Sequence, residues 1–431
     1  MNHLSQPVRS LVRSTRARPT SRFRAAFGGV HVALFGALLG AAACQTHPAD
    51  LVSLMHHEGT VYTTSSEGGT TRTKLAIRRA GTEVLFEAVG EVEFTPDDRD
   101  FVLREKGSSV ALRTRAADGD RIWTAKHGEA PQWSVNGRAT AVDESAREWL
   151  GEQVLQIARS TPLGAEARAE RILRTGGVPA LVAELEKVNH PSTKVLYLER
   201  LGDLEALTPE QLGAAIEASK NSSLPNSARA EFYVKAATAA PTDRGLTKAL
   251  LEASRPMTSG SDQARVLDAL AERSALDADS AQRWLELVWH TPSQSQRADL
   301  YLKGLEVLPA DERTRERWLK ATREVSGTSN QERLLMALAE REDCAAPTLR
   351  ALARRSGETG LSTSGRSRVQ RAVIAHPNSN SEVLLAVLDA SEALSSTRER
   401  ADVLLALLEA RPTDREVLDR EVLERIAAAS E

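Results

Sequence analysis

Cysteine and aromatic residues are scarce in this sequence. Its 431 residues include two cysteines, Cys44 and Cys344, and aromatic side chains make up 4%. No disulfide framework is expected, so the fold must be held together by the burial of apolar side chains. At this length two or three domains are expected rather than one compact core.

Familiar catalytic motifs are also missing. The sequence has no glycine-rich phosphate loop, no His-Glu-x-x-His pair, no nucleophile elbow and no Cys-x-x-Cys motif. We therefore expect a protein that is not an enzyme and that has no cofactor and no metal. An enzyme of unfamiliar type would need a deep polar pocket where the two halves of the chain join.

Residues 1–43 have the layout of an export signal. Six arginines precede an apolar run from Ala25 to Leu39, and small residues follow. The run counts about 15 residues and contains Gly28, Gly29 and His31, so it is shorter than the ~20 apolar residues of a membrane span. We predict that residues 1–43 are a cleaved signal peptide.

The end of this segment resembles the lipobox of bacterial lipoproteins. Small residues at 41–43 precede Cys44, although the family pattern prefers leucine where Ala41 stands. We expect Cys44 to carry a lipid and residues 44–57 to be a connector; plain cleavage after Ala43 is the alternative. The expected location is the cell envelope, as an outer-membrane lipoprotein facing the periplasm, or otherwise the periplasm or the exterior.

Charge restricts the partners. The whole chain has a net charge of −3 and residues 1–43 hold six arginines and no acidic residue, which leaves −9 for residues 44–431. This mild acidity argues against nucleic acid or anionic lipid headgroups as the main partner.

Residues 58–138 show the alternation of β-strands. Apolar and polar residues alternate in short segments, and glycines mark the turns between them. A small antiparallel β-meander with one dry face and one wet face is expected. The predicted strands lie around residues 60–62, 75–77, 84–86, 92–94, 101–103, 110–113 and 122–123.

Residues 139–431 show a helical period instead, and they repeat. A basic residue recurs every 32 to 36 positions and is followed each time by an apolar helix. Paired helices at this period predict an α-solenoid, HEAT-like or tetratricopeptide-like, although the diagnostic tetratricopeptide residues are not reproduced. The whole chain is thus expected to be mainly α with a small β domain. The basic residues are Lys194, Arg229, Arg265, Arg297, Arg333, Arg368 and Arg400.

This basic column has two interpretations. In the structural one, each arginine stem lies on a neighbouring repeat and its head group bonds a carboxylate or carbonyl there. In the functional one, the column is a stripe that grips an acidic ligand. Serines four positions earlier are predicted to cap the first helices, and two of them have a glutamate at the capping-box distance, Glu332 and Glu399. These serines are Ser261, Ser293, Ser329, Ser364 and Ser396.

Four further features each have a structural and a functional interpretation. The run from His56 to Glu58 could supply metal ligands, but adjacent residues of an extended segment point to opposite sides. Asp97, Asp98 and Asp100 could bind calcium, but a solvated turn paired with Arg99 or Arg121 is favoured. Trp284, Trp289 and Trp318 are predicted in the core, with an aromatic ligand groove as the alternative. Cys344 is predicted to be a small buried hydrophobe.

One segment resembles a poorly characterised bacterial module in which a β-rich part leads into helical repeats. The motifs are Gly90 to Asp100, Trp149-Leu150, Gly164 to Arg168 and Gly176 to Val178, and the likeness spans residues 58 to about 240. Such modules occur downstream of membrane zinc peptidases of the antibiotic-sensor type and in exported proteins. The resemblance implies a sensory or interaction accessory, and no catalytic residue carries over because the membrane helices and zinc motif are missing.

Together these features predict a protein- or peptide-binding module of the envelope that acts through its helical repeats. The alternative is a scaffold or regulatory accessory of an envelope system that acts through the β domain. The expected partners are an envelope protein or peptide, and the membrane through the lipid on Cys44, but no nucleic acid.

Overall fold

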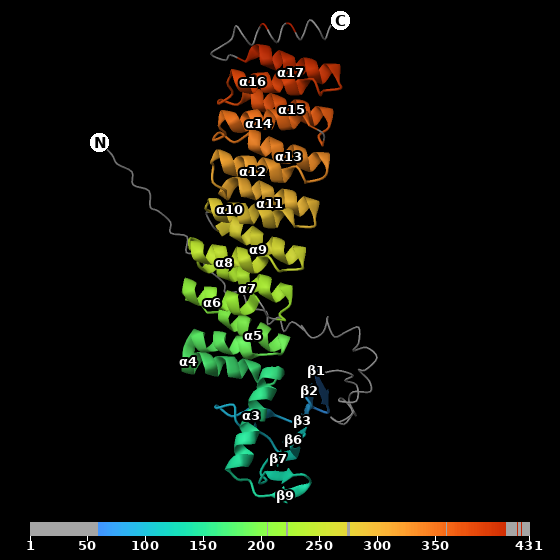
Figure 1. Cartoon of the computed structure of the whole chain (residues 1–431), viewed down its shortest axis with the longest axis vertical. Helices are drawn as coiled ribbons and strands as arrows, with labels where there is room; N and C mark the ends of the chain where they lie inside the picture. The colour runs from blue at the N-terminus through green and yellow to red at the C-terminus, as the bar shows by residue number, and fades with distance from the viewer. Residues whose placement is uncertain are drawn as a thin grey trace, which may run out of the picture.

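The computed structural model describes residues 59–410, apart from residues 205, 221, 222, 274, 275 and 359, together with residues 420 and 424. A small β-sheet lies at one end of a long column of helices (Figure 1). The predicted signal peptide, Cys44, the connector and the run from His56 to Glu58 lie outside the described residues.

Nine strands form the β part. They are β1 (Gly59–Glu67), β2 (Thr70–Arg79), β3 (Thr82–Val89), β4 (Val92–Phe94), β5 (Phe101–Leu103), β6 (Ser109–Ala116), β7 (Gly119–Lys126), β8 (Gln132–Val135) and β9 (Arg138–Thr140). Seven of them make an antiparallel sheet in the order β1-β2-β3-β6-β7-β8-β9, and β4 and β5 form a separate hairpin. The sheet is therefore the predicted meander, with one hairpin inserted between its third and fourth strands.

One face of the sheet is dry. Cross-strand pairing places Leu75, Phe86, Leu112, Trp123 and Trp133 in one row across five strands. Helix α3 (Glu144–Ser160) covers this row, because its buried apolar residues belong to the same core. The core of the β part thus continues past the last strand into the first helix.

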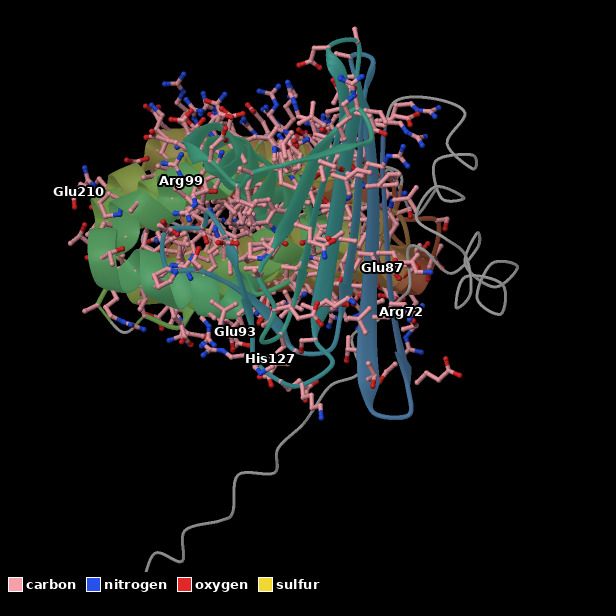
Figure 2. The ribbon with its side chains drawn as sticks, turned by 90° about the horizontal axis from the view of Figure 1, so that it is seen from below. Arg72, Glu87, Glu93, Arg99, His127 and Glu210 are labelled. Atoms are coloured by element: carbon pink, nitrogen blue, oxygen red, sulfur yellow. The ribbon has the colours of Figure 1, made fainter. Side chains whose placement is uncertain are left out.

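The other face of the sheet carries charged cross-strand pairs. Arg78 lies directly opposite Glu83 in register, and their side chains are 2.6 Å apart. Arg72 and Glu87 lie near each other on β2 and β3, 3.6 Å apart (Figure 2). Ala76 and Leu85 are nevertheless buried on this same face, so it combines a covered apolar pair with charged pairs and is not the fully wet face predicted for an antiparallel sheet.

The remaining described helices stack as a two-layer ladder. They are α4 (Ala165–Lys187), α5 (Pro191–Gly202), α6 (Pro209–Lys220), α7 (Asn226–Ala239), α8 (Arg244–Ser254), α9 (Gly260–Arg273), α10 (Ala278–Trp289), α11 (Gln294–Val307), α12 (Glu312–Thr322), α13 (Thr328–Ala339), α14 (Ala346–Gly357), α15 (Thr363–Ala375), α16 (Ser381–Ser391) and α17 (Thr397–Glu409). We call the odd-numbered helices from α5 the first-helix layer and the even-numbered helices from α4 the second-helix layer. Each helix contacts its nearest neighbours in its own layer, and the layers contact each other along the column. The predicted fold class, mainly α with a small β domain followed by helical repeats, is confirmed.

The repeat period is 34 or 35 residues. Aspartates one period apart, Asp243, Asp277 and Asp311, cap α8, α10 and α12, and each accepts a hydrogen bond from a backbone amide of the first turn. The carboxylate thereby satisfies one of the unpaired amides at the helix start. These capping aspartates mark three successive second helices and were not among the predicted caps.

The predicted serine caps are right at two positions and wrong at three. Ser293 and Ser396 cap α11 and α17. Ser261, Ser329 and Ser364 instead lie inside the first turn of their helices, and α13 begins after Gly327 without a side-chain cap, so the capping box of Ser329 is not formed. The error arose because basic residues occur at two different positions of the first helices, two residues apart.

Candidate binding surface along the second-helix layer

The predicted basic column divides into two registers. Lys194, Arg229, Arg297 and Arg400 are the fourth residues of their helices, whereas Arg265, Arg333 and Arg368 are the sixth. At the fourth position the other repeats carry Gln263, Gln331 and Arg366. The seven predicted residues therefore do not form one row on the molecule.

Most side chains at the fourth position, though not Lys194 or Arg400, bond backbone carbonyls at or just beyond the end of a second helix. Nη1 of Arg229 lies 3.4 Å from the oxygen of Lys220, and Nη2 of Arg297 lies 2.6 Å from that of Thr291. Gln263 and Gln331 donate in the same way to Ser254 and Thr322. A cation in the first turn of a helix is disfavoured by the dipole of that helix. These cations also lie at the negative, carboxyl-terminal end of the preceding second helix, and this favourable interaction offsets the unfavourable one.

Side chains at the sixth position are half exposed and face carboxylates. Arg333 lies 2.9 Å from Asp299, and Arg368 lies 2.8 Å from Glu332, each on the preceding first helix. Arg265 is 3.4 Å from Asp262 of its own helix. Each of these three cations thus has an acidic neighbour.

The aspartate turn joins the β part to the helices, a role that its sequence does not indicate. Asp98 does not pair with Arg99 or Arg121, as predicted for a solvated turn, but forms ion pairs with Arg168 and Arg171 of α4. Arg121 pairs with Asp118 instead. The partners of Asp98 lie about 70 residues away in sequence, so no local pattern signalled them.

Arg168 is the centre of a buried network that joins the β part to the helices. Its side chain is 2% exposed and donates to Asp98 at 2.6 Å, to the Tyr197 hydroxyl at 2.7 Å and to Glu184 at 2.8 Å. Glu184 also accepts from Arg159 of α3 at 2.6 Å. The β4–β5 hairpin, α3, α4 and α5 are thereby held together by charge-assisted hydrogen bonds.

The network shifts the pKa values of its members. Burial alone would raise the pKa of Glu184, but hydrogen bonds from Arg159 and the charge and hydrogen bond of Arg168 outweigh it and hold that pKa below its usual value. Burial also opposes the charge of Arg168, yet the charges around it raise its pKa. Both groups are therefore charged at neutral pH, and the network is a structural joint.

The three tryptophans of the helical ladder that were predicted in the core differ in burial. Trp284 and Trp318 are 0% and 1% exposed, and their indole nitrogens donate to the carbonyls of Leu267 and Tyr301. Trp289 is 46% exposed, so the prediction that it lies in the core is wrong. A tryptophan exposed to this degree is a candidate anchor for a partner.

Trp289 lies in a groove between α10 and α12, which we call the Trp289 groove. The groove has a volume of about 530 Å³, and Leu285 and Ala321 give it an apolar floor. Its cations are Arg317, Lys320 and Arg323, and its carboxylates are Glu286 and Glu324.

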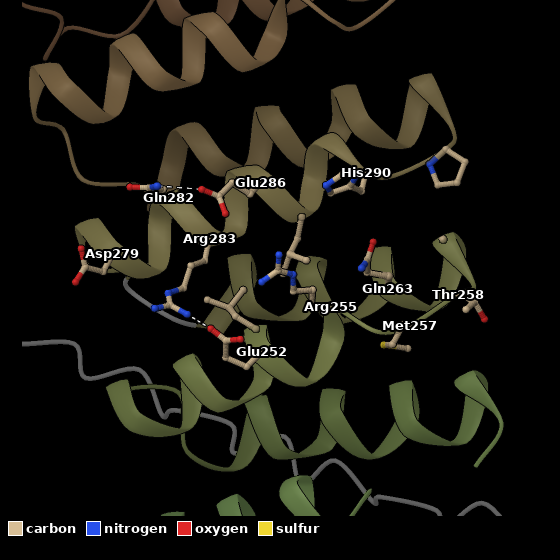
Figure 3. A pocket seen from close by; sticks show the side chains of 14 residues that line it. Glu252, Arg255, Met257, Thr258, Gln263, Asp279, Gln282, Arg283, Glu286 and His290 are labelled. Carbon is tan, nitrogen blue, oxygen red and sulfur yellow. Dashed lines mark hydrogen bonds and ion pairs between the residues drawn. The ribbon is translucent and has the colours of Figure 1, made fainter. Parts of the chain in front are cut away.

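A second groove lies between α8 and α10 and adjoins the first. Its volume is about 630 Å³, and it shares Gln282 and Glu286 of α10 with the Trp289 groove. Figure 3 shows Arg283 paired with Glu252 across this groove, while Gln282 bonds Glu286 along α10. The two grooves therefore form one continuous surface on the second-helix layer.

A third groove, of about 650 Å³, lies on the first-helix layer between α5 and α7. Its cations Lys235 and Arg265 already have acidic neighbours, Asp203 and Asp262. Its aromatic residue, Phe232, is 2% exposed. This groove thus offers a ligand less exposed aromatic surface than the Trp289 groove.

Cys344 is fully buried beside Arg315. Its sulfur accepts a hydrogen bond from Nη1 of Arg315 at 2.8 Å, and burial raises the pKa of the thiol. A buried thiol with a raised pKa is unreactive, because the thiolate is the nucleophile.

No protein-family model matches the chain, and no curated protein matches it. Among the described residues, no three histidine, cysteine, aspartate or glutamate side chains are grouped as metal ligands. No helix in the described part of the chain is long and apolar enough to cross a membrane.

Proposed function

We propose that this chain is a non-enzymatic binding module of the bacterial envelope that recognises a protein or peptide through the second-helix layer of its solenoid. The observation that carries the proposal is the half-exposed indole of Trp289 in a groove between two repeats. Solenoids present long surfaces built from successive repeats, and their usual use is recognition.

Export and anchoring are part of the proposal and rest on the sequence. Six arginines, an apolar run and small residues precede Cys44, which would carry the lipid. Mass spectrometry of the mature amino terminus tests this part. A lipid-modified Cys44 is expected, and a free Cys44 or a start beyond it contradicts the anchor.

Site-specific photo-crosslinking of the full-length protein in its native envelope tests the binding surface. One variant carries the photoreactive residue at Gln282, between the two grooves, and matched variants carry it at Lys303 of the first-helix layer and at Arg78 of the sheet. A discrete crosslinked partner from position 282, absent at position 303, is expected. Crosslinks from the sheet variant alone contradict the proposal.

The structure also favours a second candidate, a scaffold or regulatory accessory that acts through the β domain. The buried Arg168 network fixes the sheet to the first helices, so a partner bound to the sheet would be held at a defined orientation. The resemblance to modules downstream of membrane zinc peptidases supports a sensory accessory of this kind. A crosslinked partner from position 78 alone would favour this candidate.

A further inference from the structure

Trp289 can be compared with the residues at the same position in the other repeats. It is the twelfth residue counted from the start of α10, and the same position in the neighbouring second helices is occupied by Arg255 and Arg323. The repeats beyond them carry Lys220, Gly357 and Glu392 there. The ladder therefore does not require a bulky apolar residue at this position, and the indole is not explained by packing between repeats.

The ion pair between α8 and α10 can be compared with the equivalent residues of α10 and α12. Glu252 of α8 pairs with Arg283 of α10. One repeat later the equivalent residues are Glu286 and Arg317, but Glu286 accepts from Gln282 of its own helix at 2.9 Å. Arg317 makes no ion pair or hydrogen bond with any described residue.

Lys320 adds a second cation that has no partner among the described residues. At its position, the ninth of the second helix, α8 and α10 carry Glu252 and Glu286. The third cation of the groove, Arg323, is 2.7 Å from Glu358. The groove thus carries two cations without a partner among the described residues, beside an exposed indole, where the ion pair seen between α8 and α10 is not formed.

We propose that the Trp289 groove binds an acidic peptide segment that carries one bulky apolar side chain, which packs on the indole while carboxylates pair with Arg317 and Lys320. This inference rests on the proposed function and specifies its ligand class. Arg317 and Lys320 have no carboxylate partner among the described residues, and Glu286 is held by Gln282 of its own helix, so two cations beside the indole remain to pair with the carboxylates of an acidic segment.

Binding of three synthetic peptides to the full-length protein tests the ligand class. In the first, one phenylalanine is flanked by glutamates; in the second, serine replaces the phenylalanine; in the third, lysines replace the glutamates. Trp289 is itself the reporter, because the other five tryptophans are at most 8% exposed. We expect the first peptide to shield tryptophan fluorescence from acrylamide, and the other two to bind at least about tenfold more weakly.

Variants that borrow residues from other repeats locate the site without disturbing the ladder. Trp289→Arg copies Arg255, Arg317→Ala copies Ala351 and Lys320→Glu copies Glu286. By calorimetry, Trp289→Arg should weaken binding at least about 30-fold, as for a central aromatic anchor. Lys320→Glu should weaken it about fivefold or more, with a smaller effect at high salt. The matched control is Leu405→Arg, which alters an exposed apolar residue of α17 and should leave binding unchanged.

Two groups of outcomes overturn the inference. If the serine peptide binds as tightly as the first peptide, the apolar anchor is refuted. If the lysine peptide binds as tightly, the acidic ligand class is refuted. If Trp289→Arg binds the first peptide as tightly as the wild type does, the Trp289 groove is not the site. If none of the peptides binds while position 282 still crosslinks a partner, the ligand class is wrong and the proposed function stands. If position 282 gives no partner, the proposed function itself fails.

Discussion

Two tryptophans of one helix have opposite roles at the scale of single residues. Trp284 is fully buried with its indole nitrogen bonded, whereas Trp289, five residues later, is half exposed. Trp284→Ala should lower the free energy of unfolding by about 3–5 kcal/mol because it leaves a cavity. Trp289→Ala should change it by less than about 0.5 kcal/mol. Urea unfolding followed by circular dichroism measures both, and equal losses would contradict the assignment.

Arg168 should be the most sensitive charged residue of the joint. Arg168→Ala removes the shared partner of Asp98 and Glu184, which keep Arg171 and Arg159, so we expect a loss of about 1.5–3 kcal/mol, the cost of losing hydrogen bonds to charged groups. Arg174→Ala, an exposed change on the same helix, is the control and should be nearly neutral. Differential scanning calorimetry compares the two, and a neutral Arg168→Ala would show that the network does not hold the joint.

Glu184 should make the joint acid-sensitive. Its folded-state pKa lies below the usual value of 4.5, so its contribution to stability is present above pH 4.5 and is lost as the pH falls through the folded-state pKa. The stability difference between the wild type and Glu184→Gln should therefore shrink below pH 4.5. Urea unfolding at pH 7 and pH 3 measures it, and a constant difference would contradict the assignment.

Residue roles were the part of the site least open to prediction from the sequence. Trp289 falls on the same apolar period as buried residues, and its exposure depends on how α12 packs beside α10. The partners of Asp98 are distant in sequence, so only the folded chain brings them together. The burial of Cys344 was predicted, because a lone cysteine in such a chain is usually a small core residue.

Helix caps are the clearest pattern at the scale of elements. Asp243, Asp277 and Asp311 cap second helices, whereas Ala345 stands at the same position before α14 and provides no side-chain cap. Replacing one of these aspartates by alanine should cost about 1 kcal/mol, and Ala345→Asp should gain a similar amount. Thermal unfolding measures the expected loss and the expected gain of stability. An Ala345→Asp protein of unchanged stability would contradict the claim that this position caps the second helix.

The elements themselves were largely predictable from their period. Every predicted strand lies within a strand of the structure, and the switch to helices falls between Thr140 and Glu144. The register of the repeats was not predictable from the basic residues, because two arginine positions alternate along the ladder. An alignment on the capping aspartates would have found the period, since these residues are 34 apart.

At the scale of the whole molecule, the described residues form two apolar cores, and the Arg168 network is a polar joint between them. One core joins the sheet to α3, and the other runs along the ladder from α4 to α17. Because the core of the ladder is continuous, we expect a partner to bind in grooves on its surface. The two grooves flanking α10 are built largely from residues of three successive second helices. The sequence predicted the ladder, but it could not place these grooves, because each combines side chains from different repeats.

Hydrogen–deuterium exchange of the full-length protein, with and without the partner captured by crosslinking, tests the role of the second-helix layer most directly. The account predicts slower exchange in residues 278–289 and 312–322 on binding, with the strands unchanged. Slowing confined to the strands between residues 59 and 140 would contradict it.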